Sequence, residues 1–181
     1  MEYITTVDEN GNVLGTEEKV KCHLGEGILH SAFLIILFND KDEVILAKRS
    51  RAKMLWPDFW DGTVASHYDL ETPREDRVKQ RVFFETGVDC PQIEYLFQFR
   101  YQAKYEDVGS ENELCDVFAA RGIRCVSLDL NESEISEYTC LGTSELAEKI
   151  AADSMKITPW FVIALRRYLE IEKESDPRHK P

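Results

Sequence analysis

The chain has 181 residues, 43% of them hydrophobic, which is enough for one sizeable core and too few for two comfortable domains. Its formal net charge of −12 at pH 7 argues against general nucleic-acid binding, because the summed negative field repels a phosphate backbone. A small phosphorylated ligand is not excluded, since it responds to a few local Lys and Arg side chains. We expect a single domain over residues 1–174 and a flexible tail over residues 175–181.

The cysteines and the apolar segments bear on the cellular setting. There are five cysteines, an odd number, and none forms a C-x-x-C pair. The N-terminus has no basic region followed by an apolar run, so no signal peptide is predicted. The longest apolar stretch, Ala32–Phe38, is too short to cross a bilayer. We therefore expect a cytoplasmic protein with reduced thiols and no membrane insertion.

The N-terminal quarter shows strand and turn patterns. Tyr3–Val7 alternates weakly between apolar and polar residues, and the pair Asn10-Gly11 that follows is a strong hairpin signal. A short polar segment, Glu17–Cys22, leads into a predicted loop at His23–Gly27. The continuous apolar run Ser31–Phe38 then predicts a strand buried on both faces. Val44–Lys48 is expected to return beside it as a hairpin partner.

A helix is predicted from Thr72 onward. Thr72 is the expected N-cap, Pro73 fits the first helical position, and Glu75 completes a capping box. Val78 and Val82 mark the side of this helix that we expect to be buried. Behind it, Gly87 is well placed as the C-terminal cap.

The second half predicts two long strands. Ile93–Tyr105 is rich in aromatic residues, and Glu111–Ala120 follows a loop at Asp107–Ser110. Glu111 and Glu113 share one face of their strand because side chains alternate with a period of two.

The C-terminal third predicts one more strand and two helices. The strand is Arg124–Leu128, and the helices are Ser144–Ala152 and Pro159–Glu172, the second capped by Thr158. The predicted class is α/β or α+β, with a mixed β-sheet flanked by helices.

Three histidines and two glutamates form one set of candidate functional residues. His23, His30 and His67 lie in separate segments, while Glu111 and Glu113 point the same way from one strand. Imidazole together with carboxylate suits a borderline divalent ion such as Zn²⁺, Mn²⁺ or Fe²⁺. The alternative interpretation is that the histidines are structural and that Glu-x-Glu lies on a solvated strand face.

Basic side chains form a second set within this acidic chain. They are Lys19, Arg49, Arg51 and Lys53, together with Arg77 and Arg81 on the predicted helix. Arg81 and Glu85 have the i, i+4 spacing of a helix surface ion pair, which is worth a few tenths of a kcal/mol by itself. Bidentate Arg and point-charge Lys together suit a diphosphate. The alternative is that these are ordinary exposed residues.

Nine short motifs, taken in order, resemble one known family. They are Glu18-Lys19, His23, Leu29-His30-Ser31-Ala32-Phe33, Lys48-Arg49-Ser50, Trp56-Pro57, Val64-Ala65-Ser66-His67, Phe99-Arg100-Tyr101, Glu111-Asn112-Glu113-Leu114-Cys115 and Thr158-Pro159-Trp160. The family is type I isopentenyl diphosphate isomerase, in the Nudix superfamily, and the match spans about Tyr3 to Arg167. It implies a Nudix-like mixed sheet sandwiched between helices. It also implies a small-molecule isoprenoid diphosphate as substrate, in a monomer or a homodimer.

The resemblance assigns roles to the candidate residues. The implied ligands of one divalent transition metal are His23, His30, His67, Glu111 and Glu113. Glu85 would hold a Mg²⁺ ion that bridges the substrate diphosphate. The implied diphosphate contacts are Lys19, Arg49, Lys53 and Arg81.

The family reaction adds a proton to one face of an alkene and removes another from a neighbouring carbon. Glu113 and Tyr101 would move protons on one face, and the rings of Tyr101 and Trp160 would stabilise a carbocation by about 2 kcal/mol or more once desolvated. Ala65 stands where characterised members of the family have a cysteine that handles the other proton. Ser66, Tyr68, Cys22 or a water are the candidate replacements, and slow turnover is expected.

Two other functions remain open. The Nudix signature is degraded here: aligned on Glu85 and Gly87, it keeps Glu85 but has Arg81 where the signature has a carboxylate. Since Nudix hydrolases need several carboxylates on this helix to hold Mg²⁺, hydrolysis by that mechanism is disfavoured. A Nudix-type diphosphate hydrolase and a non-catalytic binder of isoprenoid diphosphates are the alternatives.

Overall fold

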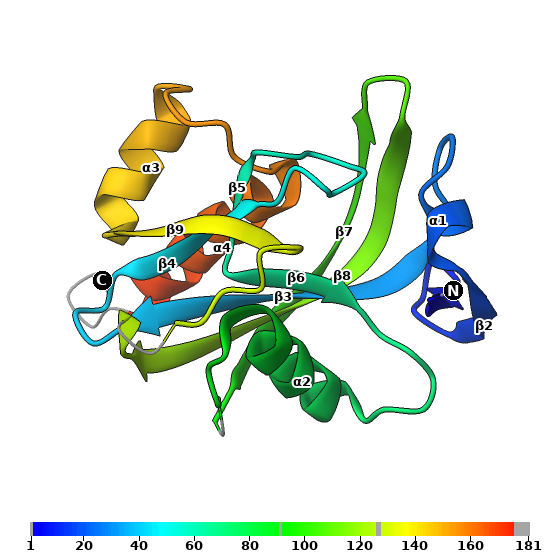
Figure 1. The fold of residues 1–181 in the computed structure, drawn as a ribbon, viewed down its shortest axis with the longest axis horizontal. Coiled ribbons are helices and arrows are strands. Elements are labelled where there is room, and N and C mark those ends of the chain that lie inside the picture. The colour runs from blue at the N-terminus through cyan, green and yellow to red at the C-terminus, as the bar shows by residue number, and fades with distance from the viewer. Residues whose placement is uncertain (1, 91, 126–127, 176–181) are drawn as a thin grey trace.

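The fold is organised around β3 (His30–Asn39), which lies among the other strands of the sheet (Figure 1) and is buried along its whole length. The computed structural model describes residues 2–90, 92–125 and 128–175. Strand β3 pairs antiparallel with β6 (Val64–His67) and parallel with β8 (Gly109–Ile123). A strand with neighbours on both edges and cover on both faces has to be apolar throughout, as the run Ser31–Phe38 is. The prediction of a strand buried on both faces is confirmed.

Further strands extend the sheet in two directions. Strand β8 pairs antiparallel with β7 (Glu94–Tyr105), and β3 also pairs with β1 (Tyr3–Val7) and with β4 (Val44–Arg49). The remaining strands are β2 (Val13–Glu18) beside β1, and β5 (Trp60–Asp61) and β9 (Ile135–Leu141), which both pair with β4. The hairpin predicted at Asn10-Gly11 is confirmed by the antiparallel pair β1–β2.

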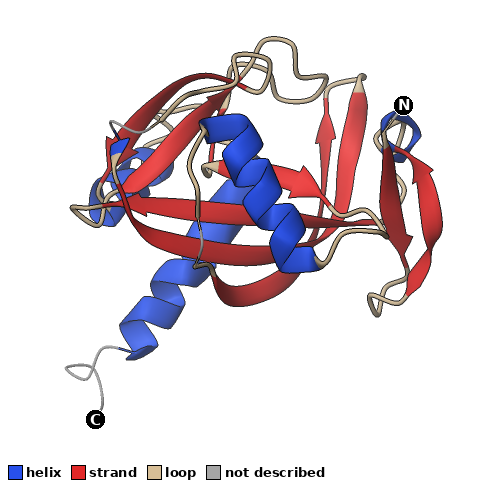
Figure 2. Ribbon diagram, turned by 60° about the horizontal axis from the view of Figure 1, so that its bottom comes forward, coloured by secondary structure: helices blue, strands red, loops and turns tan. Residues whose placement is uncertain are grey.

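Helices lie on both sides of the sheet (Figures 1 and 2). On one side α4 (Pro159–Ser175) packs against alternate residues of β3, including Leu34 and Ile36. On the other side α2 (Arg74–Thr86) packs Val78 and Val82 against a cluster that contains Phe33 and Ile35. Fully burying one such side chain stabilises the folded state by about 1.5–3 kcal/mol. A shift of β3 by one residue would turn every side chain to the other face, so the packing on both sides favours one register of β3. The predicted mixed sheet between helices is confirmed.

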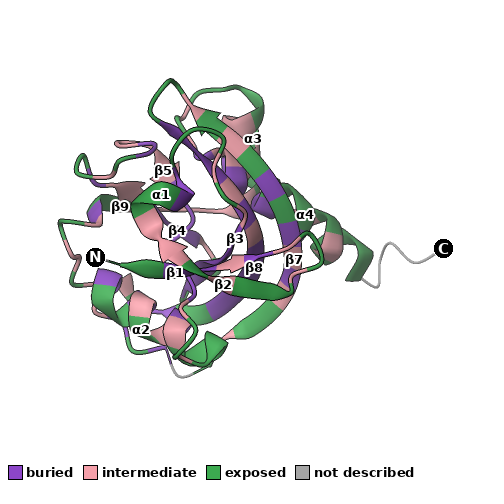
Figure 3. Cartoon of the chain, turned by 90° about the vertical axis from the view of Figure 1, so that its right-hand side faces the viewer, coloured by how far each residue is buried: buried purple, intermediate pink, exposed green. Residues whose placement is uncertain are grey.

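Two short helices complete the fold. They are α1 (Lys19–Cys22), a single turn after β2, and α3 (Thr143–Ala151), which matches the helix expected at Ser144–Ala152. Figure 3 shows burial concentrated on the central strands and on the inner sides of the helices. No helix in the described part of the chain is both long and apolar enough to span a membrane.

The start of α2 differs from the capping-box prediction. The helix begins at Arg74, and no side chain caps it. The Thr72 hydroxyl instead donates to Asp69 Oδ2 at 3.2 Å, while Asp69 Oδ1 accepts the backbone N–H groups of Glu71 and Thr72. The carboxylate is the stronger acceptor and already holds the Thr72 side chain in the preceding turn. The C-terminal cap is confirmed, because Gly87 has φ of 69° and donates to Phe83 O.

Several boundaries also differ. The strand predicted at Arg124–Leu128 is wrong for its described residues, since Cys125 lies in a 3₁₀ turn and Arg124 and Leu128 are in no strand, while residues 126–127 lie outside the description. The turn between β7 and β8 covers only residues 106–108. Helix α4 extends through Ser175, and residues 176–181 of the predicted tail lie outside the description.

Candidate active site

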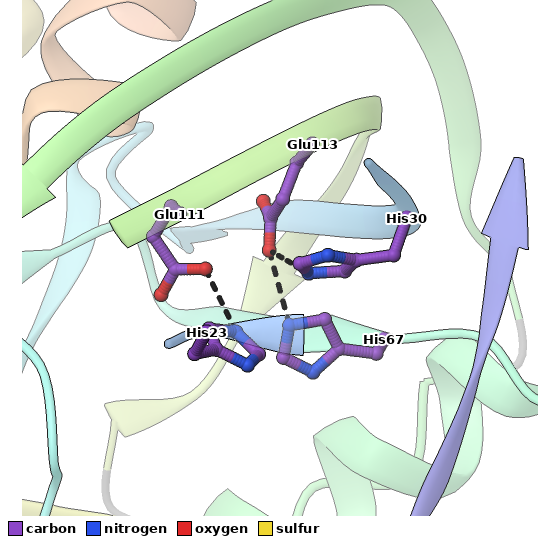
Figure 4. Close-up of side chains that lie close together, drawn as sticks. All are labelled: His23, His30, His67, Glu111 and Glu113. Carbon is purple, nitrogen blue, oxygen red and sulfur yellow. Dashed lines mark hydrogen bonds and ion pairs between the residues drawn. The ribbon is translucent and has the colours of Figure 1, made fainter. Parts of the chain in front are cut away.

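Strand register brings the predicted metal ligands together at one end of the sheet (Figure 4). Across the parallel pair β3–β8, His30 lies opposite Glu113, and across β3–β6, His67 lies opposite Ala32. Glu111 is two residues before Glu113 on the same face of β8, and His23 follows α1. One ligand atom from each of these five side chains lies within 4.8 Å of all the others, and all five residues are buried.

The carboxylates and imidazoles lie in direct contact. His23 Nε2 is 2.9 Å from Glu111 Oε2, while Glu113 Oε1 is 3.3 Å from His30 Nε2 and 3.0 Å from His67 Nε2. The opposite ring nitrogens of two histidines point to backbone carbonyls: His23 Nδ1 donates to Lys19 O at 2.6 Å, and His30 Nδ1 donates to Ile28 O at 2.7 Å. A carbonyl only accepts, so in the neutral rings the Nε2 lone pairs face the cluster.

This arrangement fits a cation at the centre of the cluster. When His23 and His30 are neutral, each Nε2 lone pair faces a carboxylate oxygen, so two acceptors meet with no proton between them. Within the described residues, His30 Nε2 and Glu111 Oε2 are buried and make no hydrogen bond. Leaving such groups unpaired costs about 1–3 kcal/mol each, and a bound cation removes that cost. Three imidazoles and two carboxylates could hold a divalent metal ion.

The pKa values follow from burial and from these contacts. Burial, with His30 and His23 as neighbours, holds the pKa of His67 well below its ordinary value, so the ring stays neutral. Burial by itself lowers the pKa of His23, but the close contact with the Glu111 carboxylate and its charge outweigh it and the pKa is raised. Burial raises the pKa of Glu113, but contacts with His30 and Tyr101 outweigh it and the pKa is lowered. Glu113 is therefore ionised at neutral pH.

A cavity of about 300 Å³ opens beside the cluster. It is lined by all four residues predicted to be catalytic, namely Ala65, Tyr101, Glu113 and Trp160. The Tyr101 hydroxyl donates to Glu113 Oε2 at 2.5 Å, and the rings of Tyr101 and Trp160 are 5.9 Å apart between centroids. Trp160 Nε1 donates to the buried Asp61 at 2.9 Å, which fixes the plane of the indole. Sequence reasoning missed Asp61, since one acidic residue after a Trp carries no spacing signal.

The four predicted diphosphate contacts also line this cavity. They are Lys19, Arg49, Lys53 and Arg81. Each is paired with a carboxylate: Lys19 with Glu2, Arg49 with Asp61, Lys53 with Glu134, and Arg81 with both Glu85 and Glu134. Arg49 also donates to the carbonyls of Leu55 and Trp56 and lies 5.2 Å from the Trp160 ring centroid. These cations are ordered and partly shielded from water.

Glu85 lies beside this cavity and not in its lining. It borders a small adjoining pocket together with Ala65, Lys53 and Glu134. Burial raises the pKa of its carboxyl group, and the nearby charges of Arg81 and Lys53 offset part of that rise. Arg81 reaches Glu85 Oε1 at 2.6 Å, which is the contact that the i, i+4 spacing predicts.

The proposed replacements for the missing cysteine lie in different places. Cys22 and Tyr68 do not line the cavity; burial raises the pKa of the Cys22 thiol to about 11, and the Tyr68 hydroxyl donates to Asp116. Ser66 does border the cavity, but by strand alternation it shares the α2-facing side of β6 with Val64. Ala65 and His67 occupy the opposite side.

Comparison with known proteins identifies relatives over most of the chain. The NUDIX domain pattern matches residues 28–161. The chain is 33% identical to isopentenyl-diphosphate Delta-isomerase 1 of Photorhabdus laumondii over 89% of this chain and 91% of that protein. It is 34% identical to the isopentenyl-diphosphate Delta-isomerase of Haloarcula marismortui over 91% of this chain and 89% of that one.

Solved structures share the fold at lower identity. A crystal structure of a Deinococcus radiodurans protein superposes with a TM-score of 0.74 at 19% identity, covering 92% of this chain and 98% of that one. The MutT protein of Methanosarcina mazei gives a TM-score of 0.64 at 16% identity, with 81% and 96% of the two chains covered. The chain therefore belongs to the NUDIX domain family and, within it, to the family of the isopentenyl-diphosphate Delta-isomerases.

Proposed function

We propose that this protein is an isopentenyl-diphosphate Delta-isomerase that moves the double bond of a five-carbon isoprenoid diphosphate. The observation that carries this proposal is a single cavity bordered by a His/Glu cluster, four ordered cations and two aromatic rings. Each group suits one part of such a substrate: the cations suit the diphosphate, and the rings and carboxylates suit the alkene. The relatives named above carry the same activity in their names.

The chain's donors fit two cations with different duties. His23, His30, His67, Glu111 and Glu113 suit a divalent transition ion such as Zn²⁺, Mn²⁺ or Fe²⁺. Such an ion, when bound, would neutralise the two carboxylates and lower the proton affinity of its ligands. Glu85, which lines the adjoining pocket, would hold a Mg²⁺ ion that accompanies the diphosphate.

Glu113 and Tyr101 would move a proton on one face of the alkene. Their oxygens are 2.5 Å apart at the cavity wall, so a proton can pass along this hydrogen bond. Burial and the adjacent Glu113 charge raise the pKa of Tyr101 well above its ordinary value, so its hydroxyl keeps its proton at rest. The tertiary carbocation that follows protonation would lie against the electron-rich faces of Tyr101 and Trp160.

Ala65 supplies no proton on the opposite face. Its methyl group lines both the main cavity and the adjoining pocket, so a water or the Ser66 hydroxyl would have to act there. Both are weaker acids than a thiol, and we infer slow turnover. The same residue favours a second candidate, a protein that binds isoprenoid diphosphates without converting them.

The cellular setting fits this assignment. All five cysteines are free thiols in the structure, which supports a cytoplasmic location. All of the proposed site residues come from one chain, so a monomer is sufficient and a homodimer is compatible.

Isotope exchange distinguishes the two candidates. We expect the metal-loaded protein, incubated with isopentenyl diphosphate in deuterated water, to form deuterium-labelled dimethylallyl diphosphate slowly, as read by NMR and mass spectrometry. Calorimetry with the same substrate runs in parallel. Binding with no label after prolonged incubation would exclude the isomerase and leave the binder.

A further inference from the structure

A glutamate that the family assignment does not use lies among the cations of the cavity. Glu134 comes directly before β9, and its carboxylate lines the cavity. Its Oε2 is in contact with Lys53 Nζ, and its Oε1 is 3.0 Å from Arg81 Nη2. The side chains of Lys53 and Arg81 are only 21% and 14% exposed, so this is a shielded pairing. Two of the four cations expected to bind a diphosphate thus share this one carboxylate.

The backbone around Glu134 is fixed on both sides. The Glu134 carbonyl accepts the Ser50 N–H at 2.9 Å, and the Glu134 N–H donates to Asn131 O at 2.9 Å. The Asn131 N–H in turn donates to Glu85 O at 3.0 Å, which ties the segment to the end of α2. The carboxylate therefore reaches the cations from a fixed point and can leave them only by rotation of its own side chain.

The carboxylate of Glu134 carries its charge at any physiological pH. Burial by itself raises the pKa of this group, but the charges and hydrogen bonds of Lys53 and Arg81 outweigh it and lower the pKa to about 2. A phosphoryl oxygen needs the same N–H donors, and it brings its own negative charge toward Glu134. The N–H donors of Lys53 and Arg81 cannot bind the Glu134 carboxylate and an incoming phosphoryl group fully at the same time.

We propose that Glu134 is a specificity-determining residue: a built-in competitor that occupies one phosphoryl position and has to be displaced by the ligand. A single phosphate would exchange one anion for another at Lys53 and Arg81 and gain little. A diphosphate also reaches Lys19 and Arg49 in the same cavity, and those added contacts offset the displacement. The identity of the anion rests on the proposed function, whereas the competition itself rests on the contacts of Glu134.

The test measures inorganic diphosphate and inorganic phosphate binding by calorimetry in the wild type, Glu134→Gln and Glu137→Gln. Glu137 lies three residues away on β9, pairs with Lys48 outside the cavity, and gives a matched loss of one negative charge. We expect Glu134→Gln to bind diphosphate about tenfold or more tightly, a change of roughly 1.4 kcal/mol. The ratio of the Glu134→Gln affinities for diphosphate and phosphate should be smaller than in the wild type. Glu137→Gln should behave as the wild type.

Unchanged or weaker diphosphate binding in Glu134→Gln, or no binding by any variant, would overturn the proposal. Weaker binding would show that Glu134 instead positions Lys53 and Arg81. Should Glu134→Gln fail to fold, Glu134→Asp keeps the charge but shortens the reach, and it should give an intermediate gain in affinity; no gain overturns the proposal. Isotope exchange separates this inference from the proposed function. Tighter diphosphate binding by Glu134→Gln without isotope exchange would exclude only the isomerase function. Isotope exchange without tighter binding would exclude only the competition by Glu134.

Discussion

At the scale of single residues, two features define the site. Hydrogen-bond acceptors of histidines and glutamates face one another, and an alanine stands where the family has a cysteine. Carbonyl contacts orient the rings of His23 and His30 so that their Nε2 lone pairs meet the Glu111 and Glu113 carboxylates. Such contacts are unfavourable without a cation between them, which makes metal content a direct measure of the arrangement. Ala65, in contrast, lines the cavity without offering an exchangeable proton.

Removing one ligand should lower metal content without unfolding the protein. Glu111→Gln keeps the size of the side chain but replaces an anionic donor with a neutral amide. Because changing a residue that only supports a metal ligand already costs about 10–100-fold in metal affinity, changing a ligand itself should cost at least as much. We expect elemental analysis of the purified variant to show substoichiometric transition metal. Glu94→Gln, an exposed carboxylate on β7, is the control and should retain it. Equal metal in both variants would contradict the proposed ligand set.

Restoring a thiol should raise activity. Ala65→Cys places an exchangeable proton on the cavity wall, and general acid catalysis typically contributes 10²–10⁴-fold. We expect isotope exchange with isopentenyl diphosphate to rise by about 10²-fold or more, while substrate affinity changes little. Ala65→Ser is the matched control, because its hydroxyl is similar in size but a far weaker acid. An increase in neither variant would argue against a catalytic surface at this position.

At the scale of elements, carboxylates accept the hydroxyl groups of the two threonines that the sequence suggests as helix caps. Asp69 orders the turn before α2, while Asp61 accepts the Thr158 hydroxyl at 2.9 Å just before α4. The Thr158 side chain therefore links α4 to β5 and helps to place Trp160, which also donates to Asp61. Local spacing identified the helices, but the partners at their ends come from residues distant in the sequence or from the preceding turn.

The C-terminal cap of α2 gives a stability prediction. Gly87→Ala puts a side chain at φ of 69°, and its Cβ would lie 2.9 Å from Asp129 Cβ. A left-handed conformation alone costs a non-glycine residue about 1–2 kcal/mol, and the contact adds to that. We expect urea denaturation to show a loss of about 2 kcal/mol. Gly142→Ala is the control, because beyond its chain neighbours no heavy atom of the described residues lies within 4 Å of the added Cβ, and it should lose less than about 1 kcal/mol. Similar losses in both variants would contradict this account.

At the scale of the whole molecule, the protein is acidic and its proposed ligand, a diphosphate, is an anion. The net charge of −12 opposes both the compact state and the approach of a diphosphate, while the four cations of the cavity act only at short range. Because each cation of the cavity is paired with a carboxylate, the cations are held in position and the protein surface does not become basic.

Salt should therefore stabilise this protein. Raising the ionic strength from 0.01 M to 0.15 M shortens the screening length from about 30 Å to about 8 Å and weakens the repulsion among surface carboxylates. We expect Tm, measured by calorimetry, to rise by several degrees. A neutral osmolyte at equal osmolality is the control for effects unrelated to charge. A fall in Tm with salt would indicate that ion pairs outweigh the net repulsion.

Some of the architecture was readable from local pattern because the pattern has a local cause. The apolar run Ser31–Phe38 specified the central strand, and the pair Asn10-Gly11 specified the first hairpin. Strand β9 gave no comparable signal, since most of its residues are exposed or half-buried and its partner β4 lies far earlier in the chain, with β5, β6, α2, β7 and β8 between them. The two-residue strand β5 was likewise too short to show a period.

The sequence by itself determined the fold class, the buried strand and the identity of most charged and aromatic residues that line the cavity. A family resemblance and apolar periodicity can both be read from residue order. The tertiary structure alone decided how those residues are used. Parallel register between β3 and β8 set His30 against Glu113, and the return of the chain before β9 put Glu134 between Lys53 and Arg81. Such contacts join residues up to 83 positions apart in the chain, and their energies depend on distance and burial, which residue order does not contain.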